Sequence, residues 1–294
     1  MLELHDLGFT YPQAERPALE GVNLTLQRGD CLGLLGSNGA GKTTLLSLIA
    51  GLLTPGRGEI RWQGERRLGL VPQQPALYAG LSVAENLALF ADLYRLRGAE
   101  RRDRLARVLA ETRLEALRSR RAARLSGGQQ RRLNMAIGLL RPASLYLFDE
   151  ATVGVDAESR QHLLAAVTRL TDEGCAVIYT SHYLEEMERV AGRILLLDQG
   201  RVRMDLDKHR LLGAASGLLV EWADGPPAGL LERLRGLGLD PQPLPSGLQL
   251  ADLELPMLAR LCPLLAEYPA APSLLRFGRP SLEQCYLSLT GGRL

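Results

Sequence analysis

A glycine-rich stretch, Gly36-Ser-Asn-Gly-Ala-Gly-Lys-Thr-Thr44, constrains the fold of this chain more than any other feature. Its spacing, Gly36-x4-Gly41-Lys42-Thr43, matches the P-loop pattern. The context is also the required one, because an apolar strand pattern over 31–35 precedes it and a helical pattern over 45–53 follows. A chance match in a chain of this composition arises about twice in a thousand sequences. The stretch therefore predicts an α/β fold with a phosphate site between a strand and a helix.

Each residue type in this loop has a separate role in binding phosphate. The glycines let backbone N–H groups turn toward a phosphate, because a Cβ would obstruct that curve. The helix that follows adds the partial positive charge of its N-terminus. We expect Lys42 to reach the β- and γ-phosphates and Thr43 to place its hydroxyl on Mg²⁺. The predicted nucleotide-binding residues of the loop are Gly36, Ser37, Asn38, Gly39, Ala40, Gly41, Lys42, Thr43 and Thr44.

Strand and helix patterns alternate along most of the chain. The predicted strands are 2–11, 19–26, 31–35, 59–62, 67–71, 145–148, 176–180 and 194–197. The predicted helices are 45–53, 157–170, 183–190 and a helical block over 83–140. Ser82 and Glu85 make a capping box at the start of that block. Alternation of this kind implies a parallel sheet covered on both faces, into which the helical block is inserted.

The pattern changes after about Leu212, where prolines cluster and the charged residues become sparser. The expected elements are strand 218–223, helix 228–237, strands 239–244 and 247–251, helix 255–267, strand 274–277 and helix 281–289. A βαββαβ order fits a small ferredoxin-like domain. We therefore predict two domains, 1–212 and 213–294, the second with an α+β fold.

Composition excludes several other classes of protein. The net charge of +2 is too small to argue for a nucleic-acid partner. The cysteines form no CxxC pair, so we expect reduced, mostly buried thiols at Cys31, Cys175, Cys262 and Cys285. Neither a signal peptide nor a run of 18 apolar residues is found. An arginine-rich run over 95–124 is interpreted as a solvated helix face, with anionic lipid or RNA binding as the alternative.

Two later stretches distinguish one family among the many that carry a P-loop. Leu125-Ser-Gly-Gly-Gln129 is followed by the apolar run Leu145-Tyr-Leu-Phe and then by Asp149-Glu150. With these motifs the sequence resembles the ABC ATPase family, in which the LSGGQ signature is diagnostic. The resemblance covers residues 2 to about 210. It implies a P-loop NTPase with a parallel core sheet, an antiparallel β subdomain and an inserted helical subdomain over about 82–140.

The resemblance also implies roles for residues outside the P-loop. Tyr11 resembles the aromatic residue that stacks on adenine, with ordinary packing as the alternative. Gln73 resembles the glutamine that touches Mg²⁺ and the attacking water. Asp156 resembles the end of the D-loop. His182 resembles the switch histidine beside the γ-phosphate, and it follows a predicted strand at the sheet edge where ligands bind.

Two carboxylates at the end of an apolar strand make a Walker B motif. Asp149 is placed to hold the Mg²⁺ shell, and Glu150 to polarise a water for in-line attack. The predicted catalytic residues are Lys42, Gln73, Glu150 and His182, and the predicted metal ligands are Thr43, Gln73 and Asp149. Ala151 and Val153 stand where family members often have proline and serine.

A second predicted anion site lies at Ser126, Gly127, Gly128 and Gln129, which open a helix. An ordinary helix cap is the alternative interpretation. Two phosphate-binding helix ends cannot both close on one ATP within this chain. The resemblance implies that they do so across a dimer, here expected to be a homodimer.

The family resemblance does not by itself say which cellular process the ATP hydrolysis drives. Family members that act on ribosomes resemble two cassettes joined in one chain, and those that act in DNA repair resemble a cassette interrupted by a long coiled coil. Neither pattern is present in this sequence. Residues 131–139 and 280–290 resemble exporters of the ABC-2 type, with an importer as the alternative. We therefore expect ATP hydrolysis that powers transport, in a cytoplasmic chain held at the cytoplasmic membrane face by a separate transmembrane permease.

Overall fold

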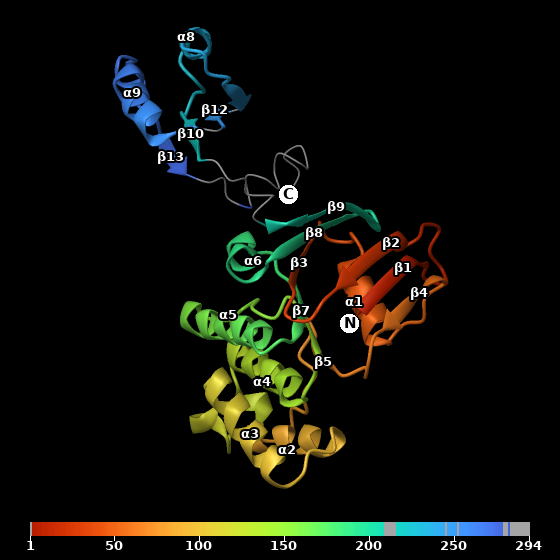
Figure 1. Cartoon of the computed structure of the whole chain (residues 1–294). Helices are drawn as coiled ribbons and strands as arrows, with labels where there is room; N and C mark the ends of the chain where they lie inside the picture. The colour runs from red at the N-terminus through yellow and green to blue at the C-terminus, as the bar shows by residue number, and fades with distance from the viewer. Residues whose placement is uncertain (1, 209–215, 245, 252, 279–281, 283–294) are drawn as a thin grey trace. The chain divides into compact units, whose positions relative to one another are not determined.

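The computed structural model describes residues 2–208, 216–244, 246–251, 253–278 and 282. The chain divides into two compact units, Met1–Lys208 and His209–Leu294 (Figure 1). The predicted boundary between 212 and 213 lies outside the described residues, as does most of the predicted helix 281–289 and of the segment 280–290. Among the residues that are described, no helix is long and apolar enough to cross a membrane.

A six-stranded sheet forms the centre of the first unit, in the order β5-β6-β7-β3-β8-β9. Its strands are β3 (Cys31–Leu35), β5 (Leu68–Val71), β6 (Leu145–Asp149), β7 (Ala176–Thr180), β8 (Arg193–Asp198) and β9 (Arg201–Asp207). All neighbours pair in parallel except β9, which is antiparallel to β8. The predicted parallel sheet is confirmed. β9 is an additional strand, and its alternation of charged and apolar residues is the signal that could have found it.

An antiparallel sheet, β2-β1-β4, forms a second layer of this unit, as predicted. Its strands are β1 (Leu2–Phe9), β2 (Leu19–Leu26) and β4 (Arg57–Trp62). The predicted strand 2–11 is two residues too long, because Phe9 pairs with Leu19 and no residue of β2 is left to pair with Thr10.

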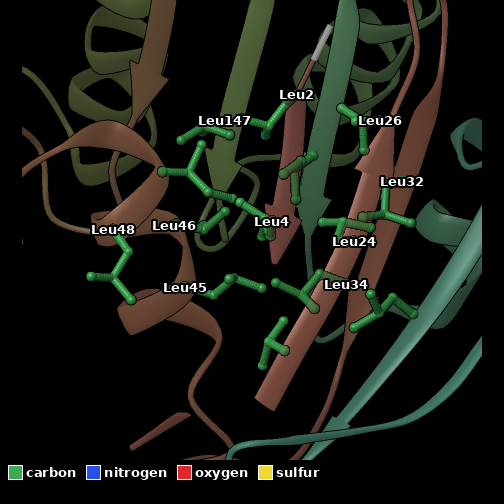
Figure 2. Packing of buried hydrophobic residues seen from close by; sticks show 14 of the residues in the cluster. Leu2, Leu4, Leu24, Leu26, Leu32, Leu34, Leu45, Leu46, Leu48 and Leu147 are labelled. Carbon is green, nitrogen blue, oxygen red and sulfur yellow. The ribbon is translucent and has the colours of Figure 1, made fainter. Parts of the chain in front are cut away.

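Leucine side chains join the two sheets to helix α1 (Lys42–Ala50). Figure 2 shows Leu2, Leu4, Leu24 and Leu26 of the antiparallel sheet packed with Leu32 and Leu34 of β3, Leu45, Leu46 and Leu48 of α1, and Leu147 of β6. These side chains are almost completely buried, and each such leucine contributes about 1.5–3 kcal/mol. The cluster therefore fixes the helix that follows the P-loop against both sheets.

The predicted helical block contains two short 3₁₀ helices, Glu115–Leu117 and Ala122–Arg124, and three α-helices, α2 (Val83–Leu93), α3 (Gly98–Thr112) and α4 (Gly127–Leu140). They pack on one another, and Figure 1 shows them as one group. The chain leaves α2 and α3 through left-handed residues, Arg95 at φ 59° and Arg113 at φ 53°. The capping box of Ser82 and Glu85 is confirmed, since each side chain accepts the other's backbone N–H. Helices α5 (Ala157–Asp172) and α6 (Leu184–Val190) contact β7 and β3 of the core sheet.

The second unit has the predicted βαββαβ order. Its elements are β10 (Gly217–Glu221), α8 (Leu230–Gly236), β11 (Gln242–Leu244), β12 (Gly247–Leu250), α9 (Leu255–Ala266) and β13 (Leu274–Gly278). The strand order is β11-β12-β10-β13, and every pair is antiparallel. Trp222 and the leucines of both helices and of the sheet fill its separate core. Of the thiols expected to be mostly buried, Cys31 is buried, Cys175 is half-buried and Cys262 is exposed on α9, while Cys285 lies outside the described residues.

Candidate nucleotide site

The P-loop connects the end of β3 to the start of α1. Gly41 is the N-cap of α1, with φ 104° and no side-chain capping bond. A Cβ at Gly41 would lie 2.6 Å from the carbonyl oxygen of Ala18, so only glycine fits there. Since no side chain caps α1, its first backbone N–H groups remain available to an anion.

Lys42 lies over this loop, where its Nζ donates to the carbonyl oxygens of Gly36 at 2.7 Å and Ser37 at 3.1 Å. The residue is only 8% exposed. Burial lowers the pKa of Lys42, while the nearby carboxylates of Glu150 and Asp149 act in the opposite direction. A buried ammonium group beside a helix N-terminus is suited to a polyphosphate, which would supply the negative charge it lacks.

Asp149 and Thr43 meet although they belong to β6 and α1. Oγ1 of Thr43 donates to Oδ2 of Asp149 at 3.0 Å, and Oγ1 of Thr180 donates to Oδ1 at 2.9 Å. A hydroxyl and a single carboxylate fit Mg²⁺, which usually takes one or two protein ligands together with phosphates and waters. Among the described residues there is no group of three or more His, Cys, Asp and Glu side chains that could hold a metal ion.

Glu150 is held between two of the predicted catalytic residues. Its Oε2 accepts from Nε2 of Gln73 at 2.8 Å, and its Oε1 lies 2.8 Å from Nε2 of His182. The backbone of Glu150 is left-handed at φ 50°, and its N–H donates to Oγ1 of Thr180 at 3.0 Å. Such a conformation costs on the order of 1 kcal/mol for a residue with a Cβ. This conformational cost accompanies the orientation of the Glu150 carboxylate toward Gln73 and His182.

The signature residues open α4 with a capping box. Oγ of Ser126 accepts from the N–H of Gln129 at 3.3 Å, and Oε1 of Gln129 accepts from the N–H of Ser126 at 3.1 Å. A Cβ at Gly128 would lie 3.0 Å from the carbonyl oxygen of Gly154. The signature therefore lies directly against the segment that precedes Asp156, while Ser126 and Gly127 are exposed.

Comparison with known proteins identifies the family of this chain. The sequence pattern of the family described as "ABC transporter" matches residues 19–153. A linearmycin resistance ATP-binding protein of Bacillus subtilis is 37% identical over 212 residues, covering 69% of this chain and 68% of that protein. A Nod factor export ATP-binding protein I of Cupriavidus metallidurans is 33% identical over 285 residues, covering 93% of this chain and 92% of that protein. The chain belongs to the ABC transporter family.

Solved structures of ATP-binding cassettes also resemble this chain. An ATP-binding subunit of an ABC transporter superposes with a TM-score of 0.67 at 32% identity, covering 72% of this chain and 91% of that one. A dimeric ATP-binding cassette in a post-hydrolysis state, bound to ADP and Pi, superposes with a TM-score of 0.65 at 28% identity, covering 70% of this chain and 98% of that one. The protein is thus an ABC ATPase, an enzyme that binds and hydrolyses ATP.

Tyr11 of this ABC ATPase follows β1 and is 44% exposed. Its hydroxyl lies 3.2 Å from Oγ1 of Thr44, and its ring meets Phe9 edge to face at a centroid distance of 4.9 Å. Asp156, at the end of the predicted D-loop, is the N-cap of α5 and accepts from the N–H of Ser159 at 2.9 Å. This hydrogen bond lowers the pKa of Asp156.

Sequence reasoning missed two residues of the ABC ATPase site. Thr180 bonds to Asp149 and Glu150, and its position at the end of a predicted strand, two residues before His182, is the available signal. Asn134 on α4 fixes the segment around Gln73, because its Oδ1 accepts from the N–H of Ala76 and its Nδ2 donates to the carbonyl oxygen of Pro72, both at 2.9 Å. No sequence motif indicates Asn134, since it lies inside a helix.

Proposed function

We propose that this chain is the ATPase subunit of an exporter, in which ATP hydrolysis drives transport through a separate membrane subunit. The observation that carries this proposal is the Glu150 carboxylate held between Gln73 and His182, next to the P-loop. That arrangement suits activation of a water molecule. The direction of transport is inferred from relatives that are named for export or drug resistance.

The proposed chemistry assigns one task to each group. The N–H groups of the P-loop and the ammonium of Lys42 bind the β- and γ-phosphates. Thr43, Asp149 and Gln73 are the residues that would hold Mg²⁺, and the ion would supply positive charge beside the phosphates. Glu150 orients the attacking water and takes up its proton as the water oxygen bonds to the γ-phosphorus, while the bond between the γ-phosphorus and the bridging oxygen breaks to release ADP and phosphate. His182 steadies the Glu150 carboxylate and lies on the side of the γ-phosphate.

The proposed working unit is a homodimer of ATPase subunits at the cytoplasmic face of the membrane. Ser126, Gly127, Gly128 and Gln129 of one subunit would complete the ATP site of the other. This is supported by the exposure of Ser126 and Gly127 at the N-terminus of α4, and by solved cassettes of the family that are dimeric. The alternatives are an importer ATPase and a soluble ABC ATPase without a membrane subunit.

The test is co-expression with the membrane protein encoded by the neighbouring reading frame. We expect a six-helix protein that co-purifies with this chain in detergent and changes its rate of ATP hydrolysis. The Glu150→Gln variant serves as the control, because it should form the same complex but not hydrolyse ATP. A neighbouring frame without membrane spans, together with an ATPase rate that no membrane fraction alters, would favour the soluble alternative.

A further inference from the structure

A buried carboxylate outside the predicted site, that of Glu186 on α6, gathers three hydroxyl groups. Its Oε2 accepts hydrogen bonds from Oγ1 of Thr152 at 2.7 Å, the hydroxyl of Tyr179 at 2.8 Å and Oγ of Ser181 at 2.7 Å. Glu186 is only 3% exposed, and all three partners are buried as well. A carboxylate is retained at such a depth only when hydrogen bonds and a counter-charge compensate for the lost water.

The counter-charge comes from Arg160 on α5. Its Nε lies 3.3 Å from Oε1 of Glu186, and its guanidinium lies 4.4 Å from the centre of the Tyr183 ring. Burial raises the pKa of Tyr179 well above its ordinary value, and the charge of Glu186 raises it further. The phenol therefore stays protonated, and it can donate to the carboxylate throughout the working range of pH.

The three hydroxyls come from the two chain segments that carry the catalytic pair. Thr152 stands two residues after Glu150, and Ser181 immediately precedes His182. Oγ of Ser181 also accepts from the N–H of Tyr183 at 3.0 Å, which closes the turn around His182. A single carboxylate oxygen thus ties the segment after β6 to the segment after β7.

We propose that Glu186 is a positioning residue, which holds the Glu150 and His182 segments in the relation that places their side chains 2.8 Å apart. This inference rests on the roles proposed above for Glu150 and His182. Glu186 itself does not touch ATP or the attacking water. It acts through Thr152 and Ser181, which it keeps at a fixed distance from each other.

A group that only stabilised the fold would behave differently. Its loss would lower the unfolding temperature, while the molecules that stay folded would retain their turnover rate and the environment of His182. Loss of a positioning residue lowers kcat without weakening ATP binding, because the P-loop contacts are untouched. A misplacement of about 1 Å near reacting groups can cost on the order of 100-fold in rate.

The first experiment compares Glu186→Ala and Thr152→Val with Thr152→Ser. We expect the first two to lose about 10- to 100-fold in kcat, while the Kd for ATP stays within about twofold of wild type. Thr152→Ser keeps the hydroxyl and should retain most of the activity. Glu185→Ala is the matched control, because it removes the same charged group from an exposed neighbouring position on α6.

The second experiment observes the histidine rings by NMR in the nucleotide-free protein. The chain has four histidines, so the His182 signal can be assigned with a His182→Ala variant. We expect that signal to shift in Glu186→Ala and Thr152→Val but not in Glu185→Ala. This readout does not depend on ATP, so it tests the positioning directly.

The two experiments separate this inference from the proposed function. If wild type does not hydrolyse ATP, or if Glu150→Gln hydrolyses it normally, the proposed catalytic roles are wrong. If those roles hold, a kcat within about twofold of wild type in Thr152→Val, with an unmoved His182 signal, would overturn the role of Glu186. Should Glu186→Ala fail to fold, the matched pair Thr152→Val and Thr152→Ser decides the question.

Discussion

Oε1 of Glu150 lies 2.8 Å from Nε2 of His182, although the two residues follow different strands. The register of the core sheet explains the approach. Asp149 at the end of β6 is paired with Thr180 at the end of β7, so the residues that follow both strands leave the sheet at the same edge. Ligands bind at this carboxyl edge in open α/β sheets. The proposed catalytic pair therefore depends on strand register as much as on the two side chains.

We expect Lys42→Ala to abolish ATP turnover, because the variant lacks the charge that binds the β- and γ-phosphates. The measurement is a coupled ATPase assay. Lys208→Ala is the control, because Lys208 is the only other lysine of the chain and its Nζ donates to the carbonyl oxygen of Glu188, outside the nucleotide site. Activity of Lys42→Ala within about twofold of wild type would contradict the proposed role.

Tyr11→Ala should weaken ATP binding by about 1–3 kcal/mol, the scale of one base–aromatic stack. Tyr11→Phe keeps the ring but loses the hydroxyl that lies 3.2 Å from Thr44, so it should bind ATP nearly as well as wild type. Isothermal titration would measure both variants. An unchanged affinity in Tyr11→Ala would mean that the ring only packs against Phe9.

Cys31 should resist alkylation in the folded protein, whereas the exposed Cys262 should react. Burial raises the pKa of the Cys31 thiol from 9.0 to about 12. Between these values the folded chain keeps a proton that the unfolded chain loses, so the free energy of unfolding should fall as pH rises from 9 toward 12. Peptide mapping after iodoacetamide treatment tests the first expectation. Denaturation at pH 8 and 10, with Cys31→Ala as control, tests the second.

We propose that residues 213–294 form a separate module, which modulates dimer stability or partner choice without altering ATP chemistry. Every catalytic residue proposed here lies in the first unit, and the second unit has a core of its own. Deletion of 213–294 should leave a folded protein that binds ATP with unchanged affinity. Loss of ATP binding in a truncated chain that circular dichroism shows to be folded would refute the division.

Much of the site could be predicted because its residues belong to motifs that are short in sequence. The P-loop around Lys42 and the helix start at Ser126 are of this kind, since each depends on residues only a few positions apart. The contacts of Thr180 with Asp149 and of Asn134 with the segment around Gln73 are different. They depend on which strands pair and on where α4 packs, and single-sequence patterns carry neither kind of information. The strand β9 was missed although its alternation is visible.

We predict that ATP lies between Lys42 of one subunit and Ser126 of its partner. Both residues lie at helix N-termini, but α4 packs with α2 and α3, whereas α1 follows the P-loop and packs on the sheets. Burial of the γ-phosphate against a second helix end would neutralise its charge and exclude water, which suits phosphoryl transfer. Hydrolysis then removes the shared phosphate and lets the two subunits part.

Glu150→Gln should therefore bind ATP without splitting it and accumulate as a dimer in size-exclusion chromatography. Adding Ser126→Arg, which places a bulky side chain at the facing site, should return this protein to the monomer. Ser119→Arg is the matched control, because it adds the same side chain at another exposed serine of the helical group, and it should leave the dimer intact. A Glu150→Gln protein that remains monomeric with saturating ATP at high concentration would count against the shared site, because the trapped γ-phosphate is the group proposed to hold the two subunits together.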